Sequence, residues 1–192
     1  MSIHIMDSRV FGSAWGTDEM REIFDESERI QGWLDVIAAL ANAQRDLDII
    51  PAEAAANIAL QCNVDLLDLH AVGAAFDTSG HSLHGLLGAL KDLCDDGAGE
   101  WICYGATVHD ITDTWMARAL LRVWTIALRD LRHIEDTLLR LATTHRDTPM
   151  TGRTHGQAAL AITFGFKVSV WLRENRRHIE RLKATSTSPR HP

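Results

Sequence analysis

The sequence has few cysteines, no excess of positive charge and no long apolar run, and each absence excludes a class of protein. The three cysteines, Cys62, Cys94 and Cys103, are an odd number without metal-site spacing, so we expect reduced thiols rather than disulfides. The formal net charge of −7 at pH 7 argues against a nucleic-acid partner, which would require a basic surface. No apolar run approaches the length of a membrane span, so no membrane partner is expected.

The first residues also lack a targeting pattern. Residues 1–7 contain no basic region followed by an apolar one, so we expect no signal peptide and a cytoplasmic location. The remaining composition, 46% hydrophobic and 23% charged over 192 residues, is that of a globular chain able to bury a sizeable core.

Nearly the whole chain has the apolar spacing of α-helices. From Thr17, a good N-cap, apolar residues recur in steps of three and four to Ala41, which predicts one helical face. Pro51 is suited to the first turn of a second helix. Further helices are expected over residues 65–76 and 83–93.

The C-terminal part predicts two long antiparallel helices joined by a glycine-containing loop. A near-heptad apolar stripe covers residues 111–144, the loop covers 149–157, and a second stripe follows to Leu182. Two such helices cannot bury their wide apolar faces against each other alone, so we expect other copies of the chain as partners. The sequence ends in a polar segment, 185–192, that we expect to be disordered.

The fold class predicted from these patterns is all-α. We expect an N-terminal helical domain at residues 1–110, the long helices of a bundle at 111–184, and the disordered tail after them.

The segment 150–157, MTGRTHGQ, is the most informative stretch of the chain. Simple turns use Gly, Asn, Asp and Pro for backbone reasons and do not need an arginine close to a histidine. Histidine titrates near neutrality, and glycine lets the backbone approach a ligand closely. The segment therefore predicts a site that binds an anion and moves a proton, with a plain turn as the alternative.

Three segments in order resemble the adenylosuccinate lyase and 3-carboxy-cis,cis-muconate cycloisomerase branch of the fumarase/aspartase superfamily. They are residues 20–51, residues 100–114, and residues 148–157 continued by 162–167. The resemblance implies a helical homotetramer that binds a small dicarboxylate-type substrate and releases fumarate by β-elimination, with general acid–base catalysis and no cofactor. The adenylosuccinate lyase type would serve purine biosynthesis.

The resemblance also implies that the chain carries only the N-terminal part of such an enzyme. Members are more than twice as long, and their third conserved region, a mobile loop with a Met-Pro-x-Lys-x-Asn core, supplies the serine base. That pattern is absent from these 192 residues. Because the family's active site is built from three subunits, we expect a truncated helical bundle that holds part of a site.

The resemblance assigns a role to several residues of the chain. His155 is implied as the general acid, and Thr154 and Gln157 as substrate contacts. His81 is the candidate for a second catalytic histidine, although by its position after Ser-Gly it could equally be a helix-start residue. No metal site is expected, because the His-x-x-His pair that begins at His81 lacks a third ligand.

A second set of candidates lies near residue 107. Thr107 opens the segment that binds a carboxylate in the family, and Asp110 follows it as a further candidate for substrate binding. Val108 stands where Ser or Thr is usual and His109 where Gln or Ser is common, which leaves the exact substrate open. Arg9 lies where some members hold a carboxylate or phosphate, and an ordinary solvated arginine explains it equally well.

Two alternatives to an adenylosuccinate lyase type stay open at this point. One is a carboxymuconate cycloisomerase-type enzyme, and the other is a truncated, non-catalytic helical protein that assembles or binds substrate. A generic helical bundle without a site would not explain three ordered motif segments.

Overall fold

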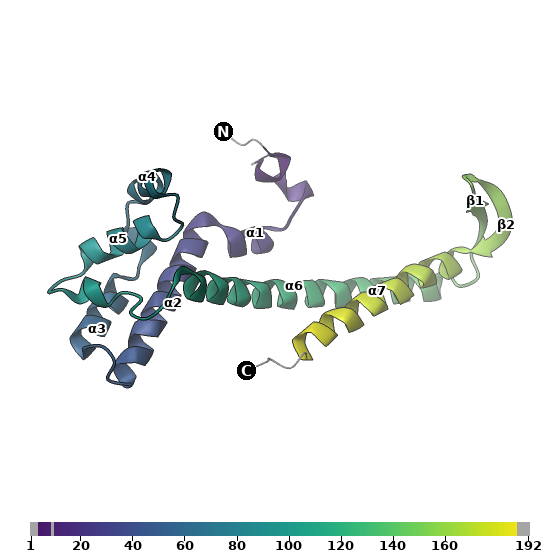
Figure 1. Cartoon of the computed structure of the whole chain (residues 1–192). Coiled ribbons are helices and arrows are strands. Elements are labelled where there is room, and N and C mark those ends of the chain that lie inside the picture. The colour runs from purple at the N-terminus through teal and green to yellow at the C-terminus, as the bar shows by residue number, and fades with distance from the viewer. Residues whose placement is uncertain (1–3, 9, 188–192) are drawn as a thin grey trace. The chain divides into compact units, whose positions relative to one another are not determined.

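The computed structural model of the chain describes residues 4–8 and 10–187 (Figure 1). The chain divides into two compact units, with the boundary between Leu121 and Arg122. This boundary lies inside the long helix α6 (Val108–Thr144), which contributes to both units. The domain boundary after residue 110 stays a prediction.

The N-terminal unit begins with short 3-10 turns, η1 (Ile5–Asp7) and η2 (Gly12–Ala14), followed by two helices, α1 (Asp18–Phe24) and α2 (Glu26–Asp46). Thr17 is the N-cap of α1, as predicted, because its hydroxyl accepts the Met20 N–H at 3.3 Å. The single helix expected from Thr17 to Ala41 is wrong. Asp25 is extended there (φ −56°, ψ 147°), and its carboxylate accepts the Ser27 N–H at 3.0 Å to start α2.

The rest of the N-terminal unit consists of short helices that alternate with turns. Helix α3 follows Pro51 as predicted, and α4 ends at Gly80, which has the left-handed conformation that suits a glycine C-cap. The elements are α3 (Ala52–Gln61), η3 (Val64–Leu66), α4 (Leu69–Ser79), α5 (His84–Leu93) and η4 (Ala98–Trp101).

The core of the N-terminal unit joins these helices to the first turns of α6. The Trp115 ring of α6 packs edge-on against Trp33, with centroids 6.2 Å apart, and against Phe24 at 6.3 Å. A Cβ at Gly32 would overlap the Trp115 ring, so this glycine allows α2 to approach α6 closely. The largest fully buried side chains here are Ile23, Leu34, Ile37, Ile58, Leu83, Leu86, Leu90 and Ile111.

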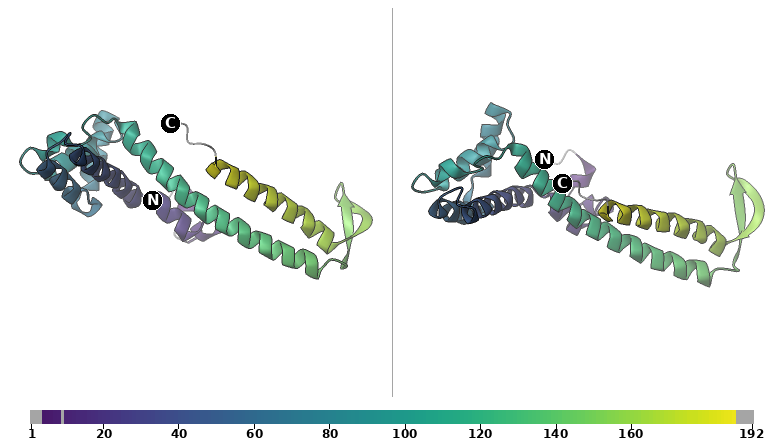
Figure 2. Two further views of the ribbon diagram at one scale, coloured as in Figure 1. Left: turned by 90° about the horizontal axis from the view of Figure 1, so that it is seen from below. Right: turned by 60° about the horizontal axis from the view of Figure 1, so that its bottom comes forward.

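The C-terminal unit consists of the remainder of α6, a β-hairpin and helix α7 (Phe164–Thr187), which runs antiparallel beside α6 (Figure 2). Two hydrogen bonds set the register of the helices. The Trp124 indole N–H donates to the Leu182 carbonyl at 2.9 Å, and the buried Asn175 amide donates to the Leu131 carbonyl at 2.9 Å. Trp124 and Leu131 lie seven residues apart on α6, and Asn175 and Leu182 lie seven residues apart on α7. The two bonds are therefore consistent with one antiparallel alignment of the helices.

A β-hairpin takes the place of the loop expected at 149–157, so that expectation is wrong. Strand β1 (Pro149–Thr154) pairs antiparallel with β2 (Gln157–Thr163). The periodicity of a short apolar run such as that of β2 does not distinguish a strand from a helix. The sequence therefore did not predict the hairpin.

Helix α7 extends beyond the end of the helix expected from the sequence. Helix α7 continues to Thr187, three residues into the segment expected to be disordered, and residues 188–192 lie outside the described part of the chain. Within the described residues, no helix combines the length and the apolar character needed to cross a membrane.

Candidate active site

The tip of the hairpin carries the three candidates of the MTGRTHGQ segment together. Thr154 pairs with Gln157, so only His155 and Gly156 form the turn. Both turn residues have positive φ, 49° and 75°, as a two-residue type I′ turn requires. The turn thus presents the exposed His155 ring between a hydroxyl and an amide side chain.

The polar side chains at the tip are free to meet a ligand. Arg153 pairs with Ala158, on the strand face opposite to the Thr154–Gln157 pair. Among the described residues, no hydrogen bond or ion pair engages the side chains of Arg153, Thr154, His155 or Gln157. One cation, one titratable imidazole and two neutral hydrogen-bonding groups therefore lie within five consecutive positions.

The second pair of candidates starts helix α6. The Thr107 backbone N–H donates to the Asp110 carboxylate at 2.8 Å, and the Asp110 N–H donates to the Thr107 carbonyl at 3.1 Å. The Asp110 side chain thus supplies one half of a capping box, and an acidic side chain at this position also complements the helix dipole. Asp110 therefore positions Thr107, and a direct contact of either residue with substrate stays a prediction.

The turn before Thr107 is held by a contact that the sequence did not reveal. The Gln44 side-chain amide of α2 donates to the Tyr104 carbonyl at 2.6 Å, across sixty residues of sequence. The turn contains two left-handed residues, Cys103 (φ 53°) and Gly105 (φ 72°). No local pattern identifies such a long-range contact, so Gln44 could be found only from the structure.

His81 lies in the turn before α5, two residues ahead of the N-cap Leu83. Its Nδ1 accepts the His84 N–H at 3.1 Å, and its own backbone N–H donates to the Ser79 hydroxyl at 3.2 Å. Because Nδ1 is an acceptor, the neutral imidazole carries its proton on Nε2, and this N–H has no partner among the described residues. A catalytic role for His81 stays a prediction that this geometry permits.

The candidates do not all belong to one unit. His155, Thr154 and Gln157 belong to the C-terminal unit, whereas His81 and the Thr107–Asp110 pair belong to the N-terminal unit. Arg9 lies outside the described residues.

The cysteines do not supply a nucleophile. Burial, with smaller contributions from the other two thiols and Asp35, raises the pKa of the Cys62 thiol to about 12. Burial alone raises the pKa of Cys103 to about 11, and burial also raises the pKa of Cys94. All three are free thiols that stay protonated at neutral pH. Within the described part of the chain, no group of His, Cys, Asp and Glu side chains is arranged to hold a metal ion.

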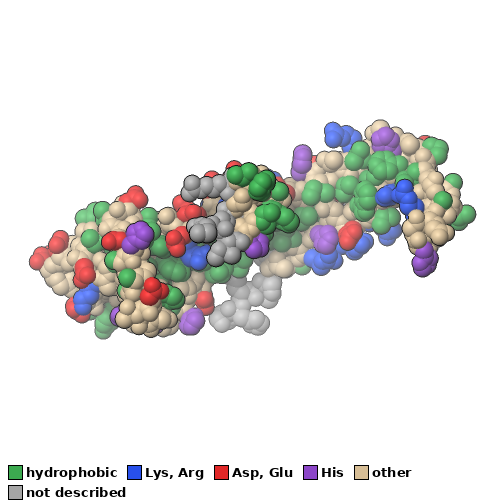
Figure 3. Space-filling view, turned by 90° about the horizontal axis from the view of Figure 1, so that it is seen from above, with side chains coloured by type: hydrophobic (Ala, Val, Ile, Leu, Met, Phe, Trp, Pro, Cys, Tyr) green, Lys and Arg blue, Asp and Glu red, His purple; other side chains and the backbone are tan. Residues whose placement is uncertain are grey.

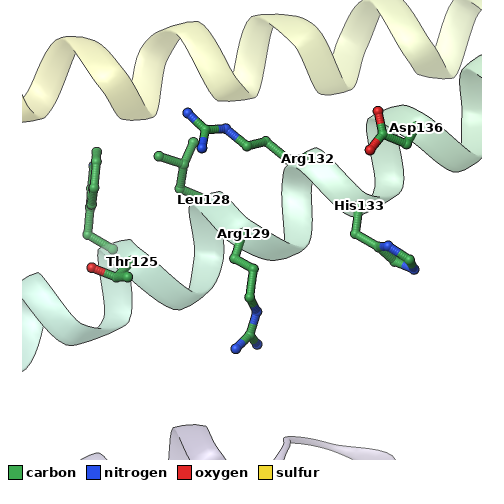
Figure 4. Close-up of a pocket in the computed structure, with 7 residues that line it drawn as sticks. Thr125, Leu128, Arg129, Arg132, His133 and Asp136 are labelled. Atoms are coloured by element: carbon green, nitrogen blue, oxygen red, sulfur yellow. The ribbon is translucent and has the colours of Figure 1, made fainter.

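An open groove along α6 contains none of the candidate residues. It is lined by Trp124, Thr125, Leu128, Arg129, Arg132, His133 and Asp136 (Figure 4). The Arg129 and His133 side chains point to one side of the helix, whereas Leu128 and Arg132 point towards α7 (Figure 4). Arg129 pairs with the neighbouring Asp130 at 2.9 Å, as a solvated helix face would.

Comparison with known proteins identifies the family. A family model described as lyase matches residues 14–190. The chain belongs to this lyase family, within the fumarase/aspartase superfamily. The N-acetyl-S-(2-succino)cysteine lyase of Dickeya dadantii (strain 3937) is 41% identical over 182 residues, which are 95% of this chain and 40% of that protein. The adenylosuccinate lyase of Methanothermobacter thermautotrophicus is 41% identical over 187 residues, 97% of this chain and 40% of that protein.

Solved structures agree with this assignment. The 3-carboxy-cis,cis-muconate lactonizing enzyme from Pseudomonas putida superimposes with a TM-score of 0.86 at 34% identity. The match covers 92% of this chain and 41% of that one. The chain thus spans about 40% of the length of the curated relatives that it matches.

Proposed function

We propose that the chain contributes the acid-bearing part of a fumarate-releasing lyase of the adenylosuccinate lyase type, with His155 as the general acid. The observation that carries the proposal is the hairpin tip, where His155 stands between Thr154 and Gln157 and none of these side chains has a partner among the described residues. The family membership supports the reaction class, because the relatives named above include lyases of succinyl compounds.

The proposed reaction is a β-elimination. A base removes a proton from the carbon next to a carboxylate, the bond from the neighbouring carbon to the leaving nitrogen breaks, and a carbon–carbon double bond forms. His155 gives its proton to the departing nitrogen, and the products are fumarate and the free amine. Thr154 and Gln157 donate hydrogen bonds to the substrate carboxylate, on which negative charge builds up in the transition state.

Thr107 and His81 supply the proposed contacts from the N-terminal unit. The Thr107 hydroxyl lies at the start of α6, where the positive end of the helix dipole favours a carboxylate, and Asp110 fixes the turn that presents it. His81 can donate from Nε2, since its Nδ1 is engaged by the His84 N–H.

The proton-abstracting base has to come from another part of the assembled enzyme. The hairpin tip contains neither a serine nor a carboxylate, and Asp110 is engaged in the helix cap. We therefore propose a homo-oligomer, a tetramer by family resemblance, in which other segments complete the site. Exposed apolar side chains of the C-terminal unit, including Leu160 (83% exposed), Phe166 and Trp171, supply a surface for such an assembly. Hydrophobic side chains lie among the polar ones on the face drawn in Figure 3. We further propose a cytoplasmic location and a role in purine biosynthesis.

Two other readings have specific support. A cycloisomerase-type reaction is favoured by the similarity to the muconate lactonizing enzyme. A non-catalytic binding protein is favoured by the lack of a base at the hairpin tip. Parallel assays with adenylosuccinate, N-acetyl-S-(2-succino)cysteine and 3-carboxy-cis,cis-muconate separate the reactions, and calorimetric titration with adenylosuccinate identifies binding without turnover.

The decisive test replaces His155 by asparagine. Asn-Gly is a favoured pair for a type I′ turn, so His155→Asn removes the acid while preserving the hairpin. Fumarate release from adenylosuccinate should fall by about 10² to 10⁴-fold, the usual contribution of a general acid. His178→Asn, on the exposed face of α7, is the matched control and should retain the wild-type rate. Equal, measurable rates for wild type and His155→Asn would remove His155 from the mechanism, whereas no fumarate release from folded wild type would favour the non-catalytic alternative.

A further inference from the structure

The hairpin contains a β-bulge between its base and its tip. Thr151 pairs with Ala161 and Arg153 pairs with Ala158, so the single residue Gly152 faces two residues, Ala159 and Leu160. A bulge of this kind bends the strand that carries the extra residue and increases its local twist. The ribbon of the hairpin is visibly curved (Figure 1).

Gly152 makes this bulge possible. A Cβ at this position would lie 2.8 Å from the Leu160 carbonyl oxygen and 3.3 Å from Cγ2 of Ile162. Real Cβ atoms do not approach a carbonyl oxygen so closely, and the backbone oxygen cannot rotate away as a side chain would. Any larger residue at 152 therefore displaces one strand from the other.

The bulge separates an anchored base from an unsupported tip. At the base, the Phe164 N–H donates to the Thr148 carbonyl at 2.9 Å and the Gly165 N–H donates to the His145 carbonyl at 2.8 Å. These bonds hold the segment that follows α6 against the first residues of α7, and so close the base of the hairpin. The tip, beyond the bulge, carries His155 and is held within the described part of the chain only by its own strand pairing. The direction of the tip is thus determined at Gly152.

We propose that Gly152 and the extra residue Ala159 form a positioning device that aims the hairpin tip, and that they affect the reaction only through the placement of His155, Thr154 and Gln157. The inference rests on the proposed function of His155. Misplacing a catalytic group by about 1 Å can cost about 10²-fold in rate, so the bend should appear in turnover rather than in fold stability.

Deletion of Ala159 tests the bend without destroying the hairpin. The deletion leaves Gly152 opposite Leu160 and keeps the neighbouring pairs and the His155–Gly156 turn, so the ladder becomes regular. A regular ladder also accommodates a Cβ at position 152. Three variants form the experiment: Gly152→Ala, the Ala159 deletion, and the two combined. Fumarate release from adenylosuccinate, its split into kcat and KM, and amide exchange of the hairpin are measured for each variant, for wild type and for His155→Asn.

The expected results distinguish an effect on the stability of the hairpin from an effect on the position of His155. Gly152→Ala alone should speed hairpin exchange and lower kcat, because the strands are forced apart. The combined variant should recover slow exchange but keep a kcat about 10²-fold below wild type, because the tip points elsewhere. Recovery of wild-type kcat in the combined variant, or wild-type kcat after the deletion alone, would show that the bulge serves only the fold. If wild type releases no fumarate, or releases it no faster than His155→Asn, the proposed function fails and the positioning role fails with it.

Discussion

The two units of the chain differ in how far they bury their apolar side chains. Among the described residues, the largest fully buried side chains all lie in the N-terminal unit except Val168 and Ile179. Both units expose some apolar side chains, such as Leu60 and Leu160, but the C-terminal unit buries fewer large side chains completely, and its helices are also joined by side-chain hydrogen bonds to main-chain carbonyls. Because burial of apolar surface is the main source of stability, the N-terminal unit should hold its own fold more firmly than the C-terminal unit.

The comparison also applies to the candidate catalytic groups. Thr107 is held by a helix cap and by the nearby Gln44–Tyr104 hydrogen bond, whereas His155 stands on a two-stranded sheet. An isolated two-stranded hairpin is marginally stable in water. The proposed acid is therefore carried by the least supported element, and partner surfaces should matter most there.

The largest effect is expected from truncating the N-terminal core. Leu34 is 0% exposed, so Leu34→Ala should lower the free energy of unfolding by about 3–5 kcal/mol through lost burial and a residual cavity. Leu139→Ala, at a position 54% exposed in the C-terminal unit, should change it by less than about 0.5 kcal/mol. Urea unfolding followed by circular dichroism measures both. Similar losses for the two variants would abolish the proposed difference between the units.

Alkaline pH should weaken the N-terminal unit selectively. The pKa of the Cys62 thiol rises from 9.0 to about 12 on folding, so above pH 9 the unfolded state releases a proton that the folded state retains. The stability conferred by the neutral thiol is complete below pH 9 and is lost as pH rises towards 12, by at most about 4 kcal/mol.

Cys62→Ala is the comparison that isolates this effect, since lysine and tyrosine also titrate at high pH. The unfolding free energy of wild type should fall more steeply between pH 9 and the highest accessible pH than that of Cys62→Ala. Parallel pH profiles for the two proteins would contradict the prediction.

The helix pair of the C-terminal unit should respond to loss of one register bond. Trp124→Phe removes the indole N–H that donates to the Leu182 carbonyl and retains most of the apolar ring. We expect a local loss of about 0.5–1.5 kcal/mol, the net value of a typical hydrogen bond. Hydrogen exchange should show faster amides in α7 and unchanged amides in α2. Equal acceleration in both helices would mean that the two units unfold together.

The sequence predicted the helices well where a cap or a breaker coincided with apolar spacing. Thr17 and Pro51 mark real helix starts because both act locally, through a hydroxyl and a fixed φ. Asp25 broke a helix that the spacing alone made continuous, since an aspartate that caps a helix does not interrupt the apolar period. The family resemblance fixed the superfamily, which composition could not have done.

The candidate site was less predictable than the fold. The MTGRTHGQ segment places its polar groups next to one another in the sequence, and their role stays a prediction. The strands were not predictable because His-Gly is an unusual type I′ pair and the β2 run is ambiguous in period. The Gly152 bulge and the Gln44 contact depend on register and on distant packing. Neither leaves a signal in a single sequence.

The smallest expected effect concerns the hairpin turn itself. His155 has a φ of 49°, a conformation that asparagine adopts at lower cost than most residues. His155→Asn should therefore stabilise the isolated hairpin by a few tenths of a kcal/mol, seen as slower exchange of the Met150 and Ile162 amides. Gly156→Ala, at φ 75°, should destabilise the hairpin by about 1 kcal/mol.

If His155→Asn instead speeds exchange, histidine contributes to the turn, and a fall in turnover could no longer be assigned to the lost acid. Slower exchange together with lost turnover would mean that the chain places a histidine where asparagine folds better, which is the expected signature of a residue required for chemistry.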